Sequence, residues 1–157
     1  MTLCPVIWQV LIDHILETTG LQSTFSKVYT NPASFDNSGY LHLSPYHQQD
    51  WCSMSSANMC KGHILTEHCR NSGVTYDVVA YVGDGTNDFC PTLRLRETDI
   101  AFPRRSFSLD RRITKGRDKV AAMVRPWDTG FDIMNALKEV WWTRQRSKPW
   151  NLTFHWC

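Results

Sequence analysis

The feature that most constrains the fold is an apolar run at residues 76–82 that ends abruptly in Gly-Asp-Gly at 83–85. The run is rich in β-branched and aromatic residues, and both of its faces are apolar, which is typical of a buried strand in a parallel sheet. The two glycines allow backbone turns that other residues resist, and Asn87 is a suitable N-cap for a helix beginning near Asp88. We therefore expect two carboxylates in the loop between the end of a strand and the start of a helix. In open α/β sheets, ligands bind at this carboxyl-terminal edge of the sheet.

The oxygen chemistry of this loop favours a metal and phosphate site. Asp84 and Asp88 supply hard oxygen ligands beside open backbone amides, and this combination suits Mg²⁺ and a phosphate. The alternative is an ordinary strand–turn–helix connection with solvated acids, which Gly-Asp-Gly alone would favour. The complete Gly-Asp-Gly-x-Asn-Asp pattern, placed directly after a buried strand, is more specific.

Four stretches of the chain have a family resemblance. They are Tyr81-Val-Gly-Asp-Gly-Thr-Asn-Asp-Phe-Cys-Pro91, Asp99-Ile-Ala-Phe-Pro-Arg-Arg105, Ser56-Ala-Asn-Met-Cys-Lys61 and Thr30-Asn-Pro-Ala33. Together they resemble the haloacid dehalogenase superfamily of phosphatases. The match is closest to the branch of phosphoethanolamine/phosphocholine phosphatases and their pyridoxal-phosphate phosphatase relatives. Order and spacing fit that branch from about Ile12 to about Val140.

The resemblance implies covalent phosphoryl chemistry assisted by Mg²⁺. In this superfamily an aspartate attacks the phosphoryl group to form an aspartyl-phosphate. A second aspartate two residues on acts as acid and base, and Mg²⁺ holds the phosphoryl group in line. Asp84 would be the direct Mg²⁺ ligand, and Asp88 would hold a metal-bound water or the lysine. Asn87 would orient that network, and Lys61 matches the lysine that contacts phosphate.

The resemblance thus implies a catalytic set of Lys61, Asn87 and Asp88, a metal set of Asp84 and Asp88, and Mg²⁺ as cofactor. The implied substrate is a small phosphorylated metabolite: pyridoxal phosphate, phosphoethanolamine or phosphocholine. Arg104 follows the next strand, where it faces either substrate anions or solvent.

Both ends of the chain depart from the family pattern. No Asp-x-Asp-x-Thr run, which would carry the nucleophile and the acid/base aspartate, occurs in the 157 residues. Where the family has a serine and an aspartate before the first helix, this chain has Pro5 and Val6. The family's cap, which closes over substrate, has no counterpart. We therefore expect a partial phosphatase core at 1–145, lacking the nucleophile strand and the cap, and a divergent tail at 146–157.

The order of the expected elements indicates an α/β fold: an incomplete Rossmannoid domain with a parallel sheet. A small β-hairpin is expected near 35–43, around the turn sequence at 36–39. The expected helices span 5–19, 58–70 with Asn58 as cap, 91–97, 107–118, and 128–144 with Asp128 as cap, and the expected strands span 25–30, 76–82, 100–102 and 121–124.

The missing nucleophile strand has a physical consequence. In the fold that the chain resembles, that strand lies in the middle of the sheet, beside the strand at 76–82. Without it, a buried parallel strand would have an open apolar edge with unpaired backbone groups. We therefore expect the chain to be marginally stable as a monomer and to self-associate through this edge.

Composition and charge restrict the partners and the compartment. The formal charge of +2 gives no reason to propose nucleic acid or an anionic membrane. The basic residues between 104 and 119 are interrupted by Asp110 and Asp118, which favours a solvated helix face over a nucleic-acid surface. Six irregularly spaced cysteines favour reduced thiols, and residues 1–20 are not a convincing signal peptide or membrane span. We therefore expect a cytoplasmic protein.

Three hypotheses about the function stay open. The first is a phosphomonoesterase of which this chain is an incomplete version. The second is a non-catalytic relative that keeps the Mg²⁺ and phosphate half-site and binds a ligand or a partner chain; the lack of Asp-x-Asp-x-Thr favours this reading for the chain itself. The third, less favoured, is a zinc module, although the spacing lacks the usual ligand pairs. Its ligands would be Cys52, Cys60, His63, His68 and Cys69.

Overall fold

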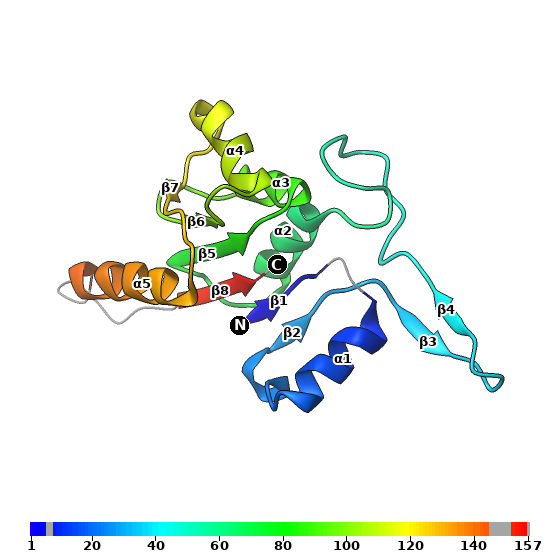
Figure 1. Cartoon of the computed structure of the whole chain (residues 1–157). Coiled ribbons are helices and arrows are strands. Elements are labelled where there is room, and N and C mark those ends of the chain that lie inside the picture. Colours follow the sequence, from blue (N-terminus) through cyan, green and yellow to red (C-terminus); the bar gives the residue numbers. More distant parts are fainter. Residues whose placement is uncertain (6–7, 145–151, 157) are drawn as a thin grey trace.

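The computed structural model describes residues 1–5, 8–144 and 152–156. Among these residues, the main sheet has six strands in the order β2-β1-β8-β5-β6-β7, and every neighbouring pair is parallel (Figure 1). The strands are β1 Thr2–Leu3, β2 Lys27–Val28, β5 Val78–Gly83, β6 Ile100–Pro103, β7 Met123–Val124 and β8 Leu152–Trp156. The α/β fold with a parallel sheet is confirmed.

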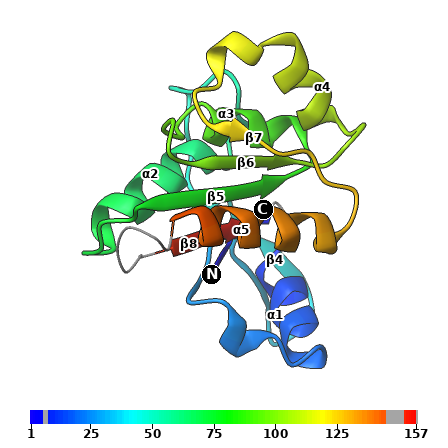
Figure 2. The same ribbon diagram turned by 90° about the vertical axis from the view of Figure 1, so that its left-hand side faces the viewer.

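Helices cover both faces of this sheet (Figure 2). The helices α2, α3 and α4 supply side chains to the core on one face, and α5 supplies them to the core on the other. Helix α1 lies beside β2, away from the β7 edge (Figure 1). The helices are α1 Gln9–Thr18, α2 Lys61–Asn71, α3 Phe89–Thr92, α4 Ser108–Lys115 and α5 Gly130–Arg144, with short 3-10 turns η1 Gln22–Thr24, η2 Thr86–Asp88 and η3 Arg117–Lys119.

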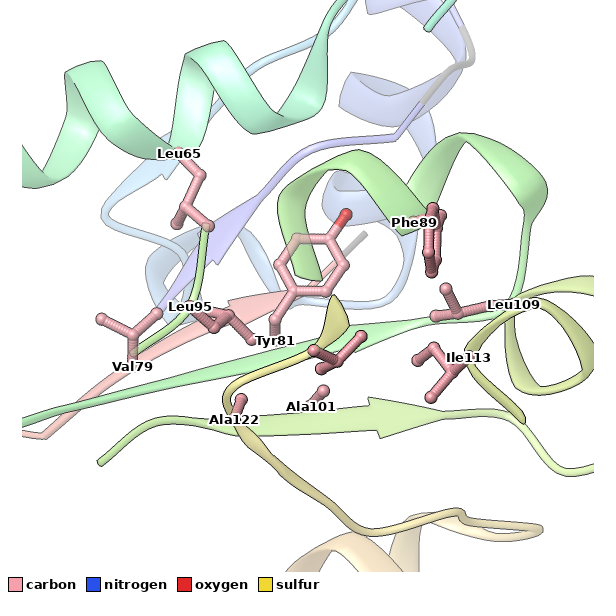
Figure 3. Close-up of a cluster of buried hydrophobic side chains, with 10 residues drawn as sticks. Leu65, Val79, Tyr81, Phe89, Leu95, Ala101, Leu109, Ile113 and Ala122 are labelled. Carbon is pink, nitrogen blue, oxygen red and sulfur yellow. The ribbon is translucent and has the colours of Figure 1, made fainter. Parts of the chain in front are cut away.

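The central strand β5 is buried along its whole length. Its side chains alternate, as strand geometry requires: Val79 and Tyr81 join the core under α2, α3 and α4, and the intervening residues join the core under α5. Figure 3 shows Tyr81 standing on the sheet between Leu95 and Leu109, with its hydroxyl directed away from the strand. Each large apolar side chain that is fully buried stabilises the fold by about 1.5–3 kcal/mol. The loop after β5 therefore starts from a firmly held strand.

The predicted hairpin is confirmed. Strands β3 Ala33–Phe35 and β4 Leu41–Leu43 pair antiparallel. The Asp36 carboxylate closes the turn by accepting the N–H groups of Ser38 at 2.8 Å and Tyr40 at 3.0 Å, and Gly39 supplies a φ of +82°. The hairpin extends away from the main sheet (Figure 1), and its strands are mostly exposed.

The other predicted strands and helices are present, with shifted ends. The first helix begins at Gln9 and not at residue 5; Val6 lies outside the described residues. The lysine-bearing helix begins at Lys61 with Cys60 as N-cap. Asn58 is not its cap, because the Asn58 amide donates to Asn31 Oδ1 at 3.0 Å.

Two further predictions about helix ends are wrong. The helix from Pro91 ends at Thr92 and does not continue to Glu97, because Asp99 folds the following residues into a turn by accepting the Arg96 N–H at 2.7 Å. Asp128 does not cap α5, because its carboxylate accepts a bond from Arg105 Nε at 2.8 Å. Asp132, four residues on, accepts the N–H of Asp128 at 3.0 Å.

The predicted open edge at β5 is also wrong. Strand β8 lies between β1 and β5 and pairs with both, so β5 has parallel neighbours on its two sides. Part of the expected tail, 152–156, is thus a strand of the main sheet, while residues 145–151 and 157 lie outside the described residues. The predicted self-association was argued from an unpaired edge of β5, which the structure does not have. Self-association itself is not tested by the structure and stays a prediction. None of the helices in the described ranges is both long and apolar enough to cross a membrane.

Candidate functional site

The loop that follows β5 is shaped by the closeness of Asp88. A Cβ atom added at Gly83 would lie 2.7 Å from Asp88 Cγ, so the strand must end in a residue without a side chain. Neither Gly83 nor Gly85 has a positive φ. The expectation that these glycines permit an unusual backbone turn is therefore wrong. Glycine is required at 83 by space.

Asp88 is the buried centre of the site, with 1% of its surface exposed. Its Oδ1 accepts bonds from Lys61 Nζ at 2.6 Å and from the Tyr81 hydroxyl at 3.0 Å. Its Oδ2 accepts the N–H groups of Asp84 at 3.0 Å and Gly85 at 2.9 Å. The last bond closes a capping box at the start of η2. Asn87 was expected to be the N-cap of a helix beginning near Asp88. That prediction is wrong, because α3 begins at Phe89 with Asp88 at its N-cap position, and the N-cap of η2 is Gly85.

Lys61 is buried at the first position of α2, with 5% of its surface exposed. A lysine in a helix is ordinarily solvated, so its ion pair with Asp88 is unusual and ties α2 to the loop after β5. A cavity of about 10 Å³ lies against Lys61 and Tyr81. That volume is about enough for one water molecule, so this cavity is too small for a phosphoryl group.

Asp84 differs from Asp88 in almost every respect. Its side chain is exposed at the carboxyl end of β5. Its backbone is fixed: the N–H donates to Asp88, and the carbonyl accepts the Leu109 N–H at 3.0 Å and the Ser108 hydroxyl at 3.2 Å. The arrangement holds an accessible carboxylate at a defined place on the ligand-binding edge of the sheet.

Asn87 lies partly buried in η2, between these two aspartates in sequence. Its amide oxygen packs over Gly85, against the position that a Cβ there would occupy. The predicted role of Asn87 in orienting the network stays a prediction.

Two further side chains lie near the site. The sequence pattern assigned no site role to Tyr81 and left open whether Arg104 faces substrate or solvent. Tyr81 was read only as a strand residue; its alternation in β5, which puts it on the α2 face, was the available signal. The Arg104 guanidinium carbon lies 4.4 Å from the centre of the Phe107 ring and 5.3 Å from that of Trp127. The backbone N–H of Arg104 donates to the Gly83 carbonyl at 2.9 Å. Arg104 therefore stands at the same sheet edge as Asp84.

The five residues that the zinc hypothesis proposed as ligands do not meet at one place in the structure. The His63 ring contacts the rings of His47 and Trp51, and the His68 ring nitrogens hydrogen bond with Thr2 and Tyr29. Of the five residues proposed, Cys52 and Cys60 are the two that meet in one group of metal-ligand atoms among the described residues, and the third member is Cys90.

Comparison with known proteins points to one family. The family described as Putative Phosphatase matches residues 7–141. The chain is 39% identical over 140 residues to the probable phosphatase phospho1 of Danio rerio, covering 83% of this chain and 50% of that protein. It is 36% identical over 135 residues to the pyridoxal phosphate phosphatase PHOSPHO2 of Bos taurus, covering 82% of this chain and 56% of the relative.

A third relative is the phosphoethanolamine/phosphocholine phosphatase of Gallus gallus, 38% identical over 136 residues, with 82% of this chain and 50% of the relative covered. The chain thus spans about half the length of the curated relatives it matches. No solved structure matches it.

Proposed function

The chain belongs to the Putative Phosphatase family, and from that premise we propose that it carries the metal and lysine half of a Mg²⁺-dependent phosphomonoesterase site. The observation that carries the proposal is the buried Lys61–Asp88 ion pair of 2.6 Å beside the exposed Asp84 carboxylate. A fixed cation and an accessible carboxylate at one sheet edge suit a phosphate bound together with a metal ion.

Asp84 fits Mg²⁺ by its donor chemistry, because it offers hard carboxylate oxygens on a fixed backbone. Asp88 fits less well as a direct ligand, because its two oxygens already accept bonds from Lys61, Tyr81 and two amides. We therefore assign Asp84 to hold the metal and Asp88 to position Lys61 and the loop. When bound, Mg²⁺ would neutralise charge on the phosphoryl group.

Lys61 would contribute a positive charge to a phosphoryl oxygen that approaches the end of β5. Asp88 keeps the ammonium group in place and, through the amides of Asp84 and Gly85, fixes the loop that carries the metal ligand. Asn87 would orient a water or an oxygen at the same edge, and Arg104 would add charge there.

The aspartyl-phosphate route needs a nucleophilic aspartate, and the sequence has no Asp-x-Asp-x-Thr run. In the fold that the chain resembles, the strand carrying that motif lies beside the strand at 76–82, and in this chain β8 pairs there. This observation favours a second candidate function: binding of Mg²⁺ and phosphate, or of a partner chain, without turnover.

The names of the relatives guide the choice of substrate. They act on pyridoxal phosphate in one case and on phosphoethanolamine or phosphocholine in another, so a small phosphorylated metabolite is the proposed ligand. The described cysteines are free thiols, which suits a reducing compartment, and the cytoplasm is the proposed location.

The test compares the unaltered chain with Asp84→Asn. Calorimetry would measure binding of Mg²⁺ with and without inorganic phosphate, and release of phosphate would be assayed with the three metabolites. Asp84→Asn should lose Mg²⁺ binding and any Mg²⁺-dependent turnover, because the ligand charge is removed while the side-chain size is kept. Asp13→Asn, at an exposed position of α1, is the matched control and should behave as the unaltered chain.

The outcomes separate the two candidate functions. Turnover by the unaltered chain that is lost in Asp84→Asn supports the enzyme, and Mg²⁺-dependent phosphate binding without turnover supports the binding role. Equal Mg²⁺ binding by the unaltered chain and by Asp84→Asn would refute the assignment of Asp84 in both.

A further inference from the structure

Three buried cysteines from three separate segments meet next to the candidate site. Cys52 comes from the loop before α2, Cys60 is the N-cap of α2, and Cys90 lies in α3. Their sulfur atoms all lie within 4.8 Å of one another. Cys90 Sγ is 3.5 Å from Cys52 Sγ and 3.8 Å from Cys60 Sγ. Their exposed fractions are 7%, 1% and 0% in chain order.

These separations match the edges of a metal–thiolate polyhedron. Zinc binds thiolate sulfur at about 2.3 Å in tetrahedral geometry, which puts neighbouring sulfurs roughly 3.8 Å apart. The two distances from Cys90 Sγ are close to that value. A small inward shift of the third pair would complete a three-sulfur face around one ion.

A fourth potential ligand, a hydroxyl oxygen, lies beside the three sulfurs. The Ser55 hydroxyl contacts Cys52 Sγ at 3.4 Å and Cys60 Sγ at 3.3 Å. This hydroxyl, or a water molecule, would complete four-coordination of an ion bound by the three sulfurs.

The loop that presents Cys52 is braced before any ion binds. The buried Gln49 amide accepts the Cys52 N–H at 2.9 Å and donates to the carbonyls of Cys52 at 3.2 Å and Ser56 at 2.9 Å. Ser55 N–H also donates to the Cys52 carbonyl at 3.2 Å. The turn from Cys52 to Ser55 is therefore fixed by the Gln49 side chain and by one main-chain bond, so little ordering would accompany metal binding.

The neighbouring helix is also fitted to the sulfurs. A Cβ atom added at Gly62 would lie 2.5 Å from Cys90 Sγ, so glycine at the second position of α2 leaves the room that this sulfur occupies. Cys60 stands at the N-terminal end of the eleven-residue helix α2, so the ion would be held at the start of that helix.

We propose that Cys52, Cys60 and Cys90 form a Zn²⁺ site that ties the loop before α2, the start of α2 and α3 together. Each thiol loses its proton to solvent on binding, and no electron transfer is involved. The site adjoins Lys61 in sequence and lies two residues after Asp88, so the ion would brace the segments that hold the ion pair. The proposal stands whether or not the chain turns over phosphate esters.

The test uses the full chain, reduced and prepared without added zinc. Titration with Zn²⁺ against a chromophoric chelator should give about one ion per chain, and Co²⁺ should produce the near-ultraviolet absorption of cobalt–thiolate bonds. Cys60→Ser and Cys90→Ser should each weaken binding by roughly tenfold or more. Cys69→Ser, half-buried elsewhere on α2, is the matched control and should bind as the unaltered chain.

The unaltered chain keeps the test decisive even if a serine variant does not fold. Its melting temperature should rise with Zn²⁺ when Mg²⁺ is already present in excess, because magnesium prefers oxygen ligands and does not compete for thiolates. The proposal is overturned if the reduced chain gives no cobalt–thiolate absorption. It is also overturned if Cys69→Ser loses as much affinity as Cys60→Ser, or if thiol titration finds Cys52 and Cys90 joined as a disulfide in air-free preparations.

Discussion

The central body of the molecule, residues 61–124, and its N-terminal arm, residues 8–43, are held by different forces. In the central body β5 and β6 are buried along their whole length. In the arm, the hairpin strands leave Phe35 62% exposed and Leu41 41% exposed, and the turn is closed by one carboxylate. The groups proposed for the phosphate site all lie in the central body, where packing fixes their positions. Equivalent substitutions in the two regions should therefore differ in cost.

The largest difference is expected for buried and exposed aspartates. Asp88→Asn should lower the free energy of unfolding by about 3–5 kcal/mol, because it leaves the buried Lys61 ammonium facing a neutral amide. Asp36→Asn in the hairpin should change it far less, because that carboxylate is solvated. Urea unfolding followed by circular dichroism measures both. Similar losses in the two variants would show that the arm is part of the same cooperative core.

Leucine truncation compares packing in the two regions. Leu109→Ala should lower the free energy of unfolding by about 2–5 kcal/mol, because Leu109 is a residue of α4 that is fully buried in the core on one face of the sheet. Leu41→Ala in β4 should change the free energy of unfolding by about 0.5 kcal/mol or less. A cost above that range at Leu41, in the same urea experiment, would mean that the hairpin is covered in solution.

Two glycines test the requirement for space at the end of β5. Gly83→Ala should cost about 1–3 kcal/mol, because the new methyl would collide with the Asp88 carboxylate. Gly130→Ala is the matched control: no atom lies within 4 Å of the added carbon, and alanine favours the helix it begins. Thermal melts should show a lowered midpoint for the first variant alone; an unchanged midpoint there would contradict the close approach.

The smallest effect is a local one in the hairpin. A hydrogen bond from His42 and backbone N–H groups hold the pKa of Asp36 below 3.8. Because this pKa is lowered in the fold, its stabilising effect is present above the unfolded pKa and is lost as pH falls through the folded pKa. His42→Ala should move the Asp36 pKa back toward 3.8 in carboxyl NMR titrations. Asp132, whose pKa is lowered mainly by the backbone N–H groups of Thr129 and Asp128, should not move.

The sequence predicted features whose causes are local. The apolar run at 76–82 became β5, and the turn residues at 36–39 became the hairpin. Both follow from patterns within ten residues, which is the range over which periodicity and turn chemistry act. The family motifs also singled out Lys61 and Asp88, and the structure brings those two together.

Features that depend on distant partners were not predictable from local patterns. Asp128 was predicted to cap α5 from its place in the sequence, but Arg105, which is distant in sequence, donates to its carboxylate. Asp132 instead accepts the N–H groups of Asp128 and Thr129. The cysteine cluster requires α2 and α3 to pack first, since Cys60 and Cys90 are thirty residues apart. The place of β8 beside β5 likewise depends on the assembled sheet.

The position of β8 also bears on how the molecule forms during synthesis. Strands β5, β6 and β7 follow one another along the chain, and each is a neighbour of the next in the sheet. They can therefore pair with one another as soon as they leave the ribosome. Residues 152–156 follow these elements in the sequence, and they pair with Thr2 and Leu3, which precede them. Until residues 152–156 are made, one side of β5 has no strand to receive its hydrogen bonds. The side of β5 that faces β8 is therefore the later of its two sides to gain a partner strand during synthesis.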